Sequence, residues 1–261
     1  MPRIATDEAE IHFEEWGEGK PLLLVHGLGM SAHLWVHQVE AFAAHYRLIA
    51  VDLRGFGRSS KPRTPGSYAI EALARDVAAV ARALELESPH FLGTSMGGFV
   101  GQALALAEPG LCRSFVLCHT GSRMSIPPDV LAARVESLQK EPLSEYAKLV
   151  VAQALAPGAS PELRRWLAEQ IEANDAHAYA QVLTEGLRDF DVTERVAAIE
   201  TPALVLVGAL DRVIPPREGR ALAARLPEAR LVEIEDVGHL SYAERPEAFN
   251  AAVLGFLARF V

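Results

Sequence analysis

Two kinds of hydrophobic pattern alternate along the chain. Short continuous apolar runs are typical of strands that are buried on both faces of a sheet. Between these runs, apolar residues recur every three or four positions, as they do along one face of a helix. Residues 11–19 alternate apolar and polar positions and predict an antiparallel edge strand. The other predicted strands are 21–27, 47–52, 90–95, 114–119, 203–208 and 229–235, and the predicted helices are 33–46, 70–86, 96–109, 216–227 and 246–260.

Repeated strand–helix–strand units predict an α/β fold, in which a mostly parallel, twisted sheet carries helices on both faces. This alternation of strands and helices stops between about residues 121 and 199, where helix-forming sequence is divided by prolines and contains no clear strand. We therefore expect a helical cap that is inserted into the sheet domain. The predicted core domain is 1–121 and 200–261, and the predicted cap is 122–199.

Composition and charge narrow the range of partners. Half of the 261 residues are hydrophobic and 23% are charged, which suits one large buried core. The net charge of −9 argues against nucleic acid or an anionic membrane as the main partner. The N-terminal sequence is unlike a signal peptide, and no apolar run approaches the roughly 20 residues of a membrane span. We expect a cytoplasmic protein that acts on a small molecule, and the oligomeric state stays open.

The stretch HFLGTSMGGFVG, residues 90–101, carries the main chemical signal. Ser95 lies between Gly93 and Gly97 in the pattern G-x-S-x-G, after a predicted strand and before a predicted helix. A sharp turn at this point projects the serine hydroxyl above the sheet, and small neighbours leave room for the turn. Ser95 is therefore the candidate nucleophile; a serine that merely sits in a glycine-rich turn is the structural alternative.

A serine nucleophile needs a general base, and the base needs a group that orients it. Asp211 follows the predicted strand 203–208, and His239 follows the predicted strand 229–235. Because the carboxyl ends of parallel strands meet at one edge of a sheet, we expect both residues to lie near Ser95. Either residue alone could be an ordinary loop residue, but the order Ser, Asp, His predicts a catalytic triad.

An oxyanion forms during acyl transfer and needs fixed hydrogen-bond donors. The backbone N–H of Met96 follows the nucleophile at the start of a helix. A second N–H is expected from the loop HGLG after an early strand, where Leu28 is the candidate. We predict that Leu28 and Met96 form the oxyanion hole.

The same loop supports a rival interpretation. Residues 27–32 match G-x-G-x-x-A, and Asp52 follows about 20 residues later, which is the pattern of a dinucleotide-binding turn in an NAD(P)-binding Rossmann protein. That interpretation leaves the three triad candidates unexplained. A hydrolase-like protein that binds a ligand without catalysis is a second alternative.

Neither a metal nor a cofactor is expected. His33 and His37 have helical i,i+4 spacing but lack the glutamate of a zinc-binding H-E-x-x-H helix. Hydrolysis by an activated serine needs only water.

Several segments in one order resemble the α/β-hydrolase superfamily over nearly the whole chain: HGLG, DLRGFGRS, GTSMGG, GALDRVIPP and GHLSYAERPEAF. The resemblance implies an α/β-hydrolase fold with its nucleophile, acid and base at the three triad candidates. Within the superfamily, HGLGMSAHLW and HLSYAERPEAFNAAVLGFL are most similar to 3-oxoadipate enol-lactonases. Three positions depart from that narrower pattern: Phe56 replaces an expected histidine, and His119 and Tyr242 replace expected asparagines.

The substrate is less well defined than the chemistry. The resemblance implies a small carboxylic ester or lactone, with 3-oxoadipate enol-lactone as one candidate. A broad carboxylesterase or aryl esterase and a C–C bond hydrolase of vinylogous diketones are alternatives. An acidic lactone would need a cation, for which the candidates are Arg123, Arg134, Arg164, Arg165 and Arg188. The predicted pocket residues are His26, Trp35, His119, Trp166 and Leu240.

Overall fold

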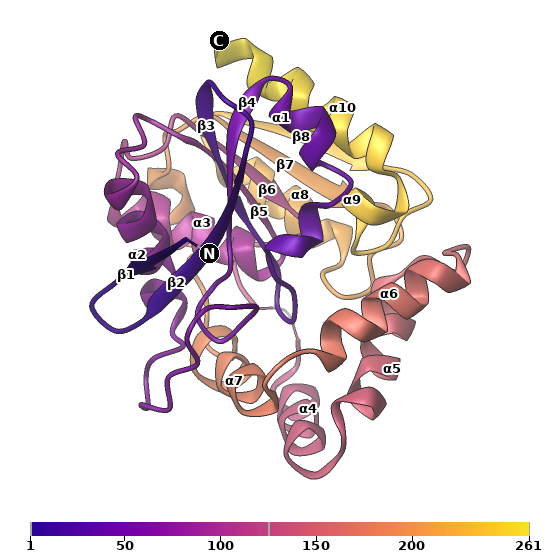
Figure 1. Cartoon of the computed structure of the whole chain (residues 1–261). Helices are drawn as coiled ribbons and strands as arrows, with labels where there is room; N and C mark the ends of the chain where they lie inside the picture. The colour runs from indigo at the N-terminus through magenta and orange to yellow at the C-terminus, as the bar shows by residue number, and fades with distance from the viewer. Residues whose placement is uncertain (1, 125, 261) are drawn as a thin grey trace.

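The computed structural model describes residues 2–124 and 126–260, and in this part the strands form one eight-stranded sheet (Figure 1). The strand order is β1-β2-β4-β3-β5-β6-β7-β8. All pairs from β4 to β8 are parallel, so the prediction of an α/β fold with a mostly parallel sheet is confirmed. The strands are β1 (Arg3–Ala5), β2 (Glu10–Trp16), β3 (Lys20–Val25), β4 (Tyr46–Val51), β5 (His90–Thr94), β6 (Ser114–Cys118), β7 (Ala203–Gly208) and β8 (Ala229–Ile234).

The N-terminal strand departs from the prediction in one respect. β2 is antiparallel, as expected, and pairs Phe13 with Val51 of β4. It is not the edge strand, because β1 pairs along its outer side, with Ile4 opposite Ile11. A three-residue strand such as β1 is too short to show a hydrophobic period in the sequence.

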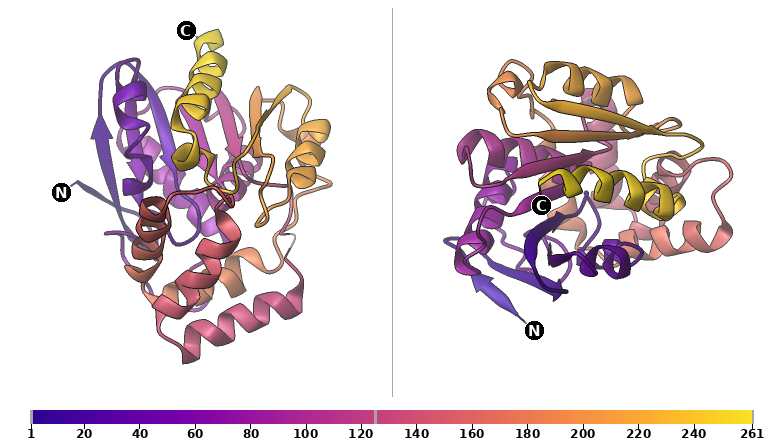
Figure 2. Two further views of the ribbon diagram at one scale, coloured as in Figure 1. Left: turned by 90° about the vertical axis from the view of Figure 1, so that its right-hand side faces the viewer. Right: turned by 90° about the horizontal axis from the view of Figure 1, so that it is seen from above.

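Helices cover both faces of the sheet (Figure 2). α1 (Val39–Ala43) and α10 (Pro246–Leu257) pack against each other on one face. α2 (Ile70–Ala83), α3 (Met96–Ala107) and α8 (Pro216–Arg225) lie on the other, where α3 and α8 both contact the short helix η3 (Val196–Ala198). The central strands β5 and β6 are fully buried as a result.

The predicted helix 33–46 is wrong. Its sequence forms a 3₁₀ turn, η1 (Ala32–Trp35), followed by the short helix α1. The last residue of the predicted helix, Tyr46, is already the first residue of β4. The break falls at Gln38, which is fully buried. Its amide nitrogen donates to the Tyr242 carbonyl at 2.9 Å and to Asn250 Oδ1 at 3.1 Å. These bonds to the C-terminal part of the chain hold the segment away from one continuous helix.

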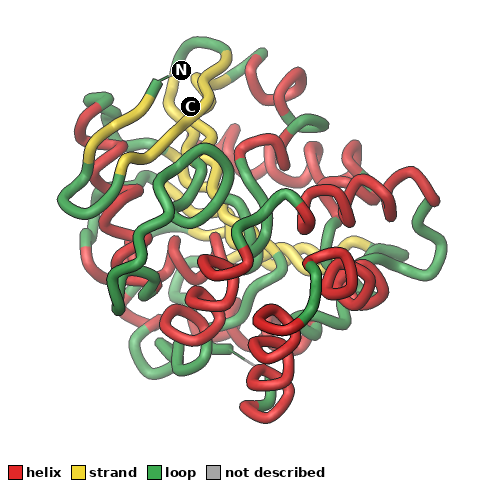
Figure 3. Tube along the Cα trace, turned by 60° about the horizontal axis from the view of Figure 1, so that its bottom comes forward, coloured by secondary structure: helices red, strands yellow, loops and turns green. Residues whose placement is uncertain are grey.

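Between β6 and β7 the chain forms a helical insertion (Figures 1 and 3). α4 and α6 begin with proline at the first helical position, where a missing N–H costs nothing. Pro142 likewise precedes α5, so the prolines that divide the sequence here, apart from Pro157, mark helix starts. The cap boundaries at residues 122 and 199 stay a prediction. The insertion contains α4 (Pro128–Lys140), α5 (Leu143–Ala154), α6 (Pro161–Glu172), α7 (Ala176–Gln181) and the π-helix η2 (Val182–Leu187).

Among the described residues, no helix has both the length and the apolar character that crossing a membrane would require.

Candidate active site

Ser95 occupies a strained turn between β5 and α3. Its φ of 54° and ψ of −116° lie in a region that residues other than glycine rarely adopt. Hydrogen bonds hold the turn on both sides: the Ser95 N–H donates to the Cys118 carbonyl, and the Ser95 carbonyl accepts from the Gly98 N–H, both at 2.8 Å. The serine side chain is thereby fixed at the carboxyl end of β5, as the G-x-S-x-G pattern predicts.

The glycines around Ser95 are required by space. A Cβ atom on Gly93 would collide with the Gly97 carbonyl, and one on Gly97 would collide with the Val25 carbonyl. A Cβ atom on Gly27 would lie 3.2 Å from the Ser95 Cβ. The turn and the loop after β3 therefore approach each other as closely as the backbone allows.

Asp211 and His239 meet at the same edge of the sheet. His239 Nδ1 lies 2.7 Å from Asp211 Oδ2, and both side chains are buried. The other carboxylate oxygen of Asp211 accepts the N–H groups of Val213 and Ile214, each at 2.9 Å. A carboxylate with this many donors is held in one orientation and can fix the tautomer of the histidine ring.

Asp211 is held as an anion. Burial by itself raises the pKa of this carboxyl, but the charge of His239 and the hydrogen bonds from His119 and His239 outweigh burial. The pKa of Asp211 consequently lies well below its usual range.

His119 joins this pair. Its Nδ1 lies 3.3 Å from Asp211 Oδ2, and its Nε2 lies 2.7 Å from the Ser241 hydroxyl. The side chains of His119, Asp211 and His239 are close enough together to bind a metal ion. The atoms that would bind it are those that form the hydrogen bonds between them, so the cluster is accounted for as a network of acid and base groups.

Hydrogen bonds of two buried side chains, His26 and Asp52, hold the loop after β3 in place. The Leu53 N–H donates to His26 Nε2 at 3.0 Å, so the other ring nitrogen carries the proton and donates to the Gly27 carbonyl at 2.7 Å. Burial lowers the pKa of His26, which keeps the ring neutral. Asp52 accepts the Ala32 N–H at 2.6 Å. These bonds fix the loop that carries Leu28.

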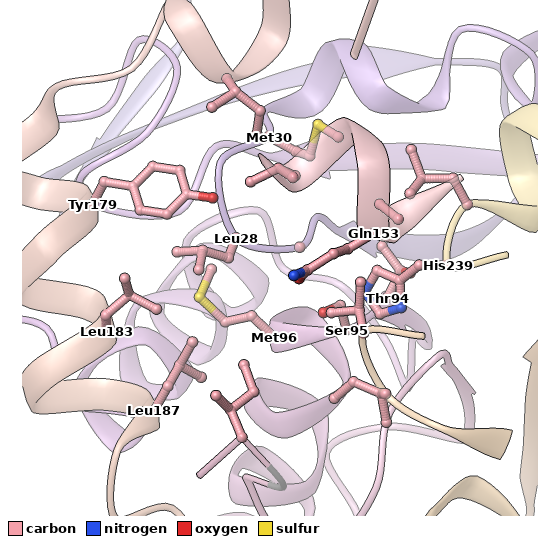
Figure 4. A pocket seen from close by; sticks show the side chains of 18 of the residues that line it. Leu28, Met30, Thr94, Ser95, Met96, Gln153, Tyr179, Leu183, Leu187 and His239 are labelled. Atoms are coloured by element: carbon pink, nitrogen blue, oxygen red, sulfur yellow. The ribbon is translucent and has the colours of Figure 1, made fainter. Parts of the chain in front are cut away.

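A cavity of about 90 Å³ opens next to Ser95 and His239 (Figure 4). Leu28 and Met96 line the same end. The remaining walls are mostly apolar and come from both the sheet edge and the helical insertion: Met30, Phe99, Met124, Ile126, Val150, Leu167, Ile171, Leu183, Leu187, Val213, Ile214, Leu240 and Tyr242.

Of the five predicted pocket residues, only Leu240 lines the cavity. His26 braces the loop after β3, and His119 lies behind Asp211. Trp35 is fully buried, with its ring 5.7 Å from that of Tyr242. Trp166 lines a separate surface hollow beside α9 (Ser241–Glu244). Both tryptophans pack against the core and do not line the cavity.

Polar side chains that were not predicted from the sequence also face the cavity. Thr94 lines it with a buried hydroxyl that has no hydrogen-bond partner. Gln153, Tyr146 and Tyr179 come from the insertion, and Figure 4 shows Gln153 reaching toward Ser95. The position of Thr94 next to Ser95 in the sequence was the one signal that could have identified it. Nothing in the helical pattern distinguishes the other three from packing residues.

Arg134 is the one candidate arginine among the cavity's lining residues. It donates to Gln153 Oε1 at 2.6 Å. Both residues, with Tyr146 and Val150, also line a surface hollow between α4 and α5. Arg134 thus stands at the mouth of the cavity, between solvent and the buried end.

The comparisons with known proteins agree with this geometry. A family profile described as "alpha/beta hydrolase fold" matches residues 20–246. The chain is 32% identical to "Putative carbamate hydrolase RutD" of Azorhizobium caulinodans, covering 98% of both chains. It is 29% identical to 3-oxoadipate enol-lactonase 2 of Acinetobacter baylyi, covering 98% of this chain and 96% of the relative. The crystal structure of the enol-lactonase from Burkholderia xenovorans LB400 has a TM-score of 0.93 at 30% identity, covering 98% of this chain and all of that one.

The crowding at the serine turn predicts opposite effects for two glycine substitutions. Gly97→Ala places a methyl group against the Val25 carbonyl and should destabilise the protein by about 1–3 kcal/mol. Gly255→Ala, in α10, meets no atom within 4 Å and should stabilise by up to about 1 kcal/mol through helix propensity. Urea unfolding of the two variants measures both changes; equal effects would contradict the close packing of the turn.

Proposed function

Since the chain belongs to the α/β-hydrolase family, we propose that it is a serine hydrolase that cleaves a small carboxylic ester or lactone through an acyl-enzyme. One observation carries the proposal: a hydrogen-bonded Asp211–His239 pair and the strained Ser95 turn lie at one end of a single cavity. A serine, a base and a group that orients the base are the three parts that nucleophilic catalysis requires.

In the first half of the reaction, Ser95 Oγ attacks the substrate carbonyl and His239 Nε2 takes the hydroxyl proton. Asp211 keeps the imidazole in the tautomer whose Nε2 is free and stabilises the imidazolium that forms. Collapse of the tetrahedral intermediate breaks the ester bond, and His239 returns the proton to the leaving oxygen. In the second half, His239 takes a proton from water, which attacks the acyl-enzyme; the bond to Ser95 Oγ breaks, His239 returns the proton to that oxygen, and the acid is released.

The backbone N–H groups of Leu28 and Met96 are the proposed oxyanion donors. Met96 begins α3, so its N–H has no acceptor within the helix. Leu28 lies in the loop that His26 and Asp52 fix, and both residues line the cavity beside Ser95. Each fixed donor of this kind contributes a factor of about 10²–10³ to the rate.

The cavity favours a small acyl group with apolar surface. Its walls are mostly apolar, and its volume of about 90 Å³ suits a small molecule. Arg134 at the mouth supplies the cation that an acidic lactone would need. This favours an ester or lactone that bears a carboxylate, such as the enol-lactone named in two of the relatives.

The dinucleotide alternative has little support. Asp52, which would have to reach a ribose, is 2% exposed and accepts hydrogen bonds from the N–H groups of Ala32 and Arg58. A Cβ atom on Gly29 would lie 2.7 Å from atoms of Ile171 and Tyr179, so the insertion occupies the space above the loop. 

Ser95→Ala should remove activity toward any ester that the protein hydrolyses, with kcat/KM falling on the order of 10⁴–10⁶-fold. A fluorophosphonate probe followed by peptide mass spectrometry should label Ser95 in the wild type and nothing in the variant. Ser160→Ala, at the exposed start of α6, is the matched control and should keep full labelling. Near-normal turnover by a folded Ser95→Ala protein would exclude the mechanism.

Arg134→Gln should distinguish acidic from neutral substrates. Loss of a charged partner for a carboxylate should lower kcat/KM for an enol-lactone acid or a half-ester of a dicarboxylic acid by about 10–100-fold. Neutral alkyl and aryl esters of the same size should change far less. Arg165→Gln, on the exposed side of α6, is the control. If the wild type prefers neutral esters, the acidic substrate is wrong while the serine mechanism stands; rapid cleavage of a vinylogous diketone would favour the C–C bond hydrolase alternative.

A further inference from the structure

We infer that His119 is a positioning residue for the acid of this site: its ring N–H holds the Asp211 carboxylate and so sets how firmly Asp211 holds the base, His239. The inference rests on the proposed serine-hydrolase function. It assigns a role to a residue at which the sequence departs from the enol-lactonase pattern.

Hydrogen bonds around the His119 ring fix which nitrogen carries the proton. The backbone N–H of Ser241 points at His119 Nε2 from 3.4 Å, and the Ser241 hydroxyl lies 2.7 Å from the same atom. A backbone N–H can only donate, so Nε2 is the acceptor and the proton of the neutral ring is on Nδ1. That N–H faces Asp211 Oδ2 at 3.3 Å and donates to it.

The ring is neutral because of where it lies. His119 is 1% exposed, and its burial lowers its pKa more than the neighbouring Asp211 carboxylate raises it. A neutral ring with a fixed tautomer is a hydrogen-bond donor to Asp211 in one defined direction.

The four donors to Asp211 have different roles. Two backbone N–H groups hold Oδ1, whereas Oδ2 receives both His239 at 2.7 Å and His119 at 3.3 Å. The shorter bond goes to the base. The longer bond withdraws part of the negative charge of the same oxygen and resists rotation of the carboxylate plane. Without His119, Oδ2 would face His239 alone.

Few other titratable groups face this network. The Glu244 carboxylate, on α9, lies near His119 and accepts the N–H groups of Ala156 and Gly238 at 2.8 and 2.9 Å. Burial raises the pKa of the Tyr242 hydroxyl and of the Cys118 thiol, so both stay neutral. The charge balance around His239 therefore depends mainly on Asp211, Glu244 and the donors to them.

The test uses phosphorylation of Ser95 by a small diethyl aryl phosphate, which needs no knowledge of the natural substrate. Ser95 Oγ forms a bond to phosphorus, the aryl oxide leaves, and the hydroxyl proton passes to His239. The second-order rate constant is measured between about pH 5 and pH 9, a range that covers titration of a histidine base.

His119→Leu should lower the rate constant at its high-pH plateau by about 10–100-fold, because the Asp211 carboxylate loses the bond that resists its rotation and no longer holds the His239 ring in one orientation. It should also move the acidic limb of the profile to higher pH. A carboxylate with one donor fewer stabilises the imidazolium more strongly, so a higher pH is needed to free the base. His119→Asn keeps an N–H donor and should stay within about threefold of the wild type, with the limb near its original place.

Ser241→Ala tests the tautomer and does not depend on the leucine variant folding. It removes the hydroxyl that contacts His119 Nε2. In a protein that keeps His119, it should reduce the rate constant of phosphorylation by about 3–10-fold. In the His119→Asn background it should have no further effect, because asparagine has no Nε2 for Ser241 to contact. Additive losses in the double variant would overturn the proposed link.

His90→Leu is the matched structural control. His90 is also 1% exposed and also contacts a serine, with Nδ1 2.8 Å from Ser114 Oγ, but it begins β5 at the opposite end from Ser95. It should lower the melting temperature and leave the pH profile unmoved. If His119→Leu behaves in the same way, His119 only packs. If the wild-type protein is not phosphorylated at Ser95 at all, both the proposed function and this inference are wrong.

Discussion

The backbone of Ser95 is held in a conformation that costs on the order of 1–3 kcal/mol, and much of the surrounding structure serves to maintain it. β6 contributes the carbonyl of Cys118, which accepts the Ser95 N–H, and α3 contributes the Gly98 N–H on the other side. Glycines at 27, 93 and 97 let three backbone segments come within contact distance. The position of Ser95 and the position of the loop that carries Leu28 therefore depend on the same close packing, and the buried central strands make that packing rigid.

The chain order explains why the candidate site could be found from the sequence. Ser95, Asp211 and His239 each follow a strand, and in a parallel sheet that condition alone brings them to the same edge. The failures have a different origin. An apolar period cannot distinguish one helix from a 3₁₀ turn followed by a short helix. The break at Gln38 depends on partners in Tyr242 and Asn250, about 200 residues farther along the chain.

The structure of the insertion was the hardest to predict from the sequence, for a similar reason. Its helices pack mainly on one another and on the rim of the sheet, so the sequence shows that they form but not how each is rotated. Arg134 and Arg165 look alike in the sequence, yet one faces the cavity and the other faces solvent. The π-helix η2 brings Leu183 and Leu187 to the cavity, and the hydrophobic pattern of the sequence does not distinguish it from an α-helix.

The cavity consequently has two walls of different physical character. The sheet edge presents Ser95 and His239, and the hydrogen bonds of Asp211 hold the His239 ring in one orientation. The insertion presents mostly apolar side chains, together with Tyr146 and Tyr179 and with Arg134 and Gln153 joined at the mouth. Apolar walls tolerate exchange of one side chain for another of similar volume, whereas a buried polar network fails when one member is removed. In the proposed mechanism, exchanges in the insertion would therefore alter which substrate fits, whereas a change at the sheet edge such as His119→Leu would alter the rate toward every substrate.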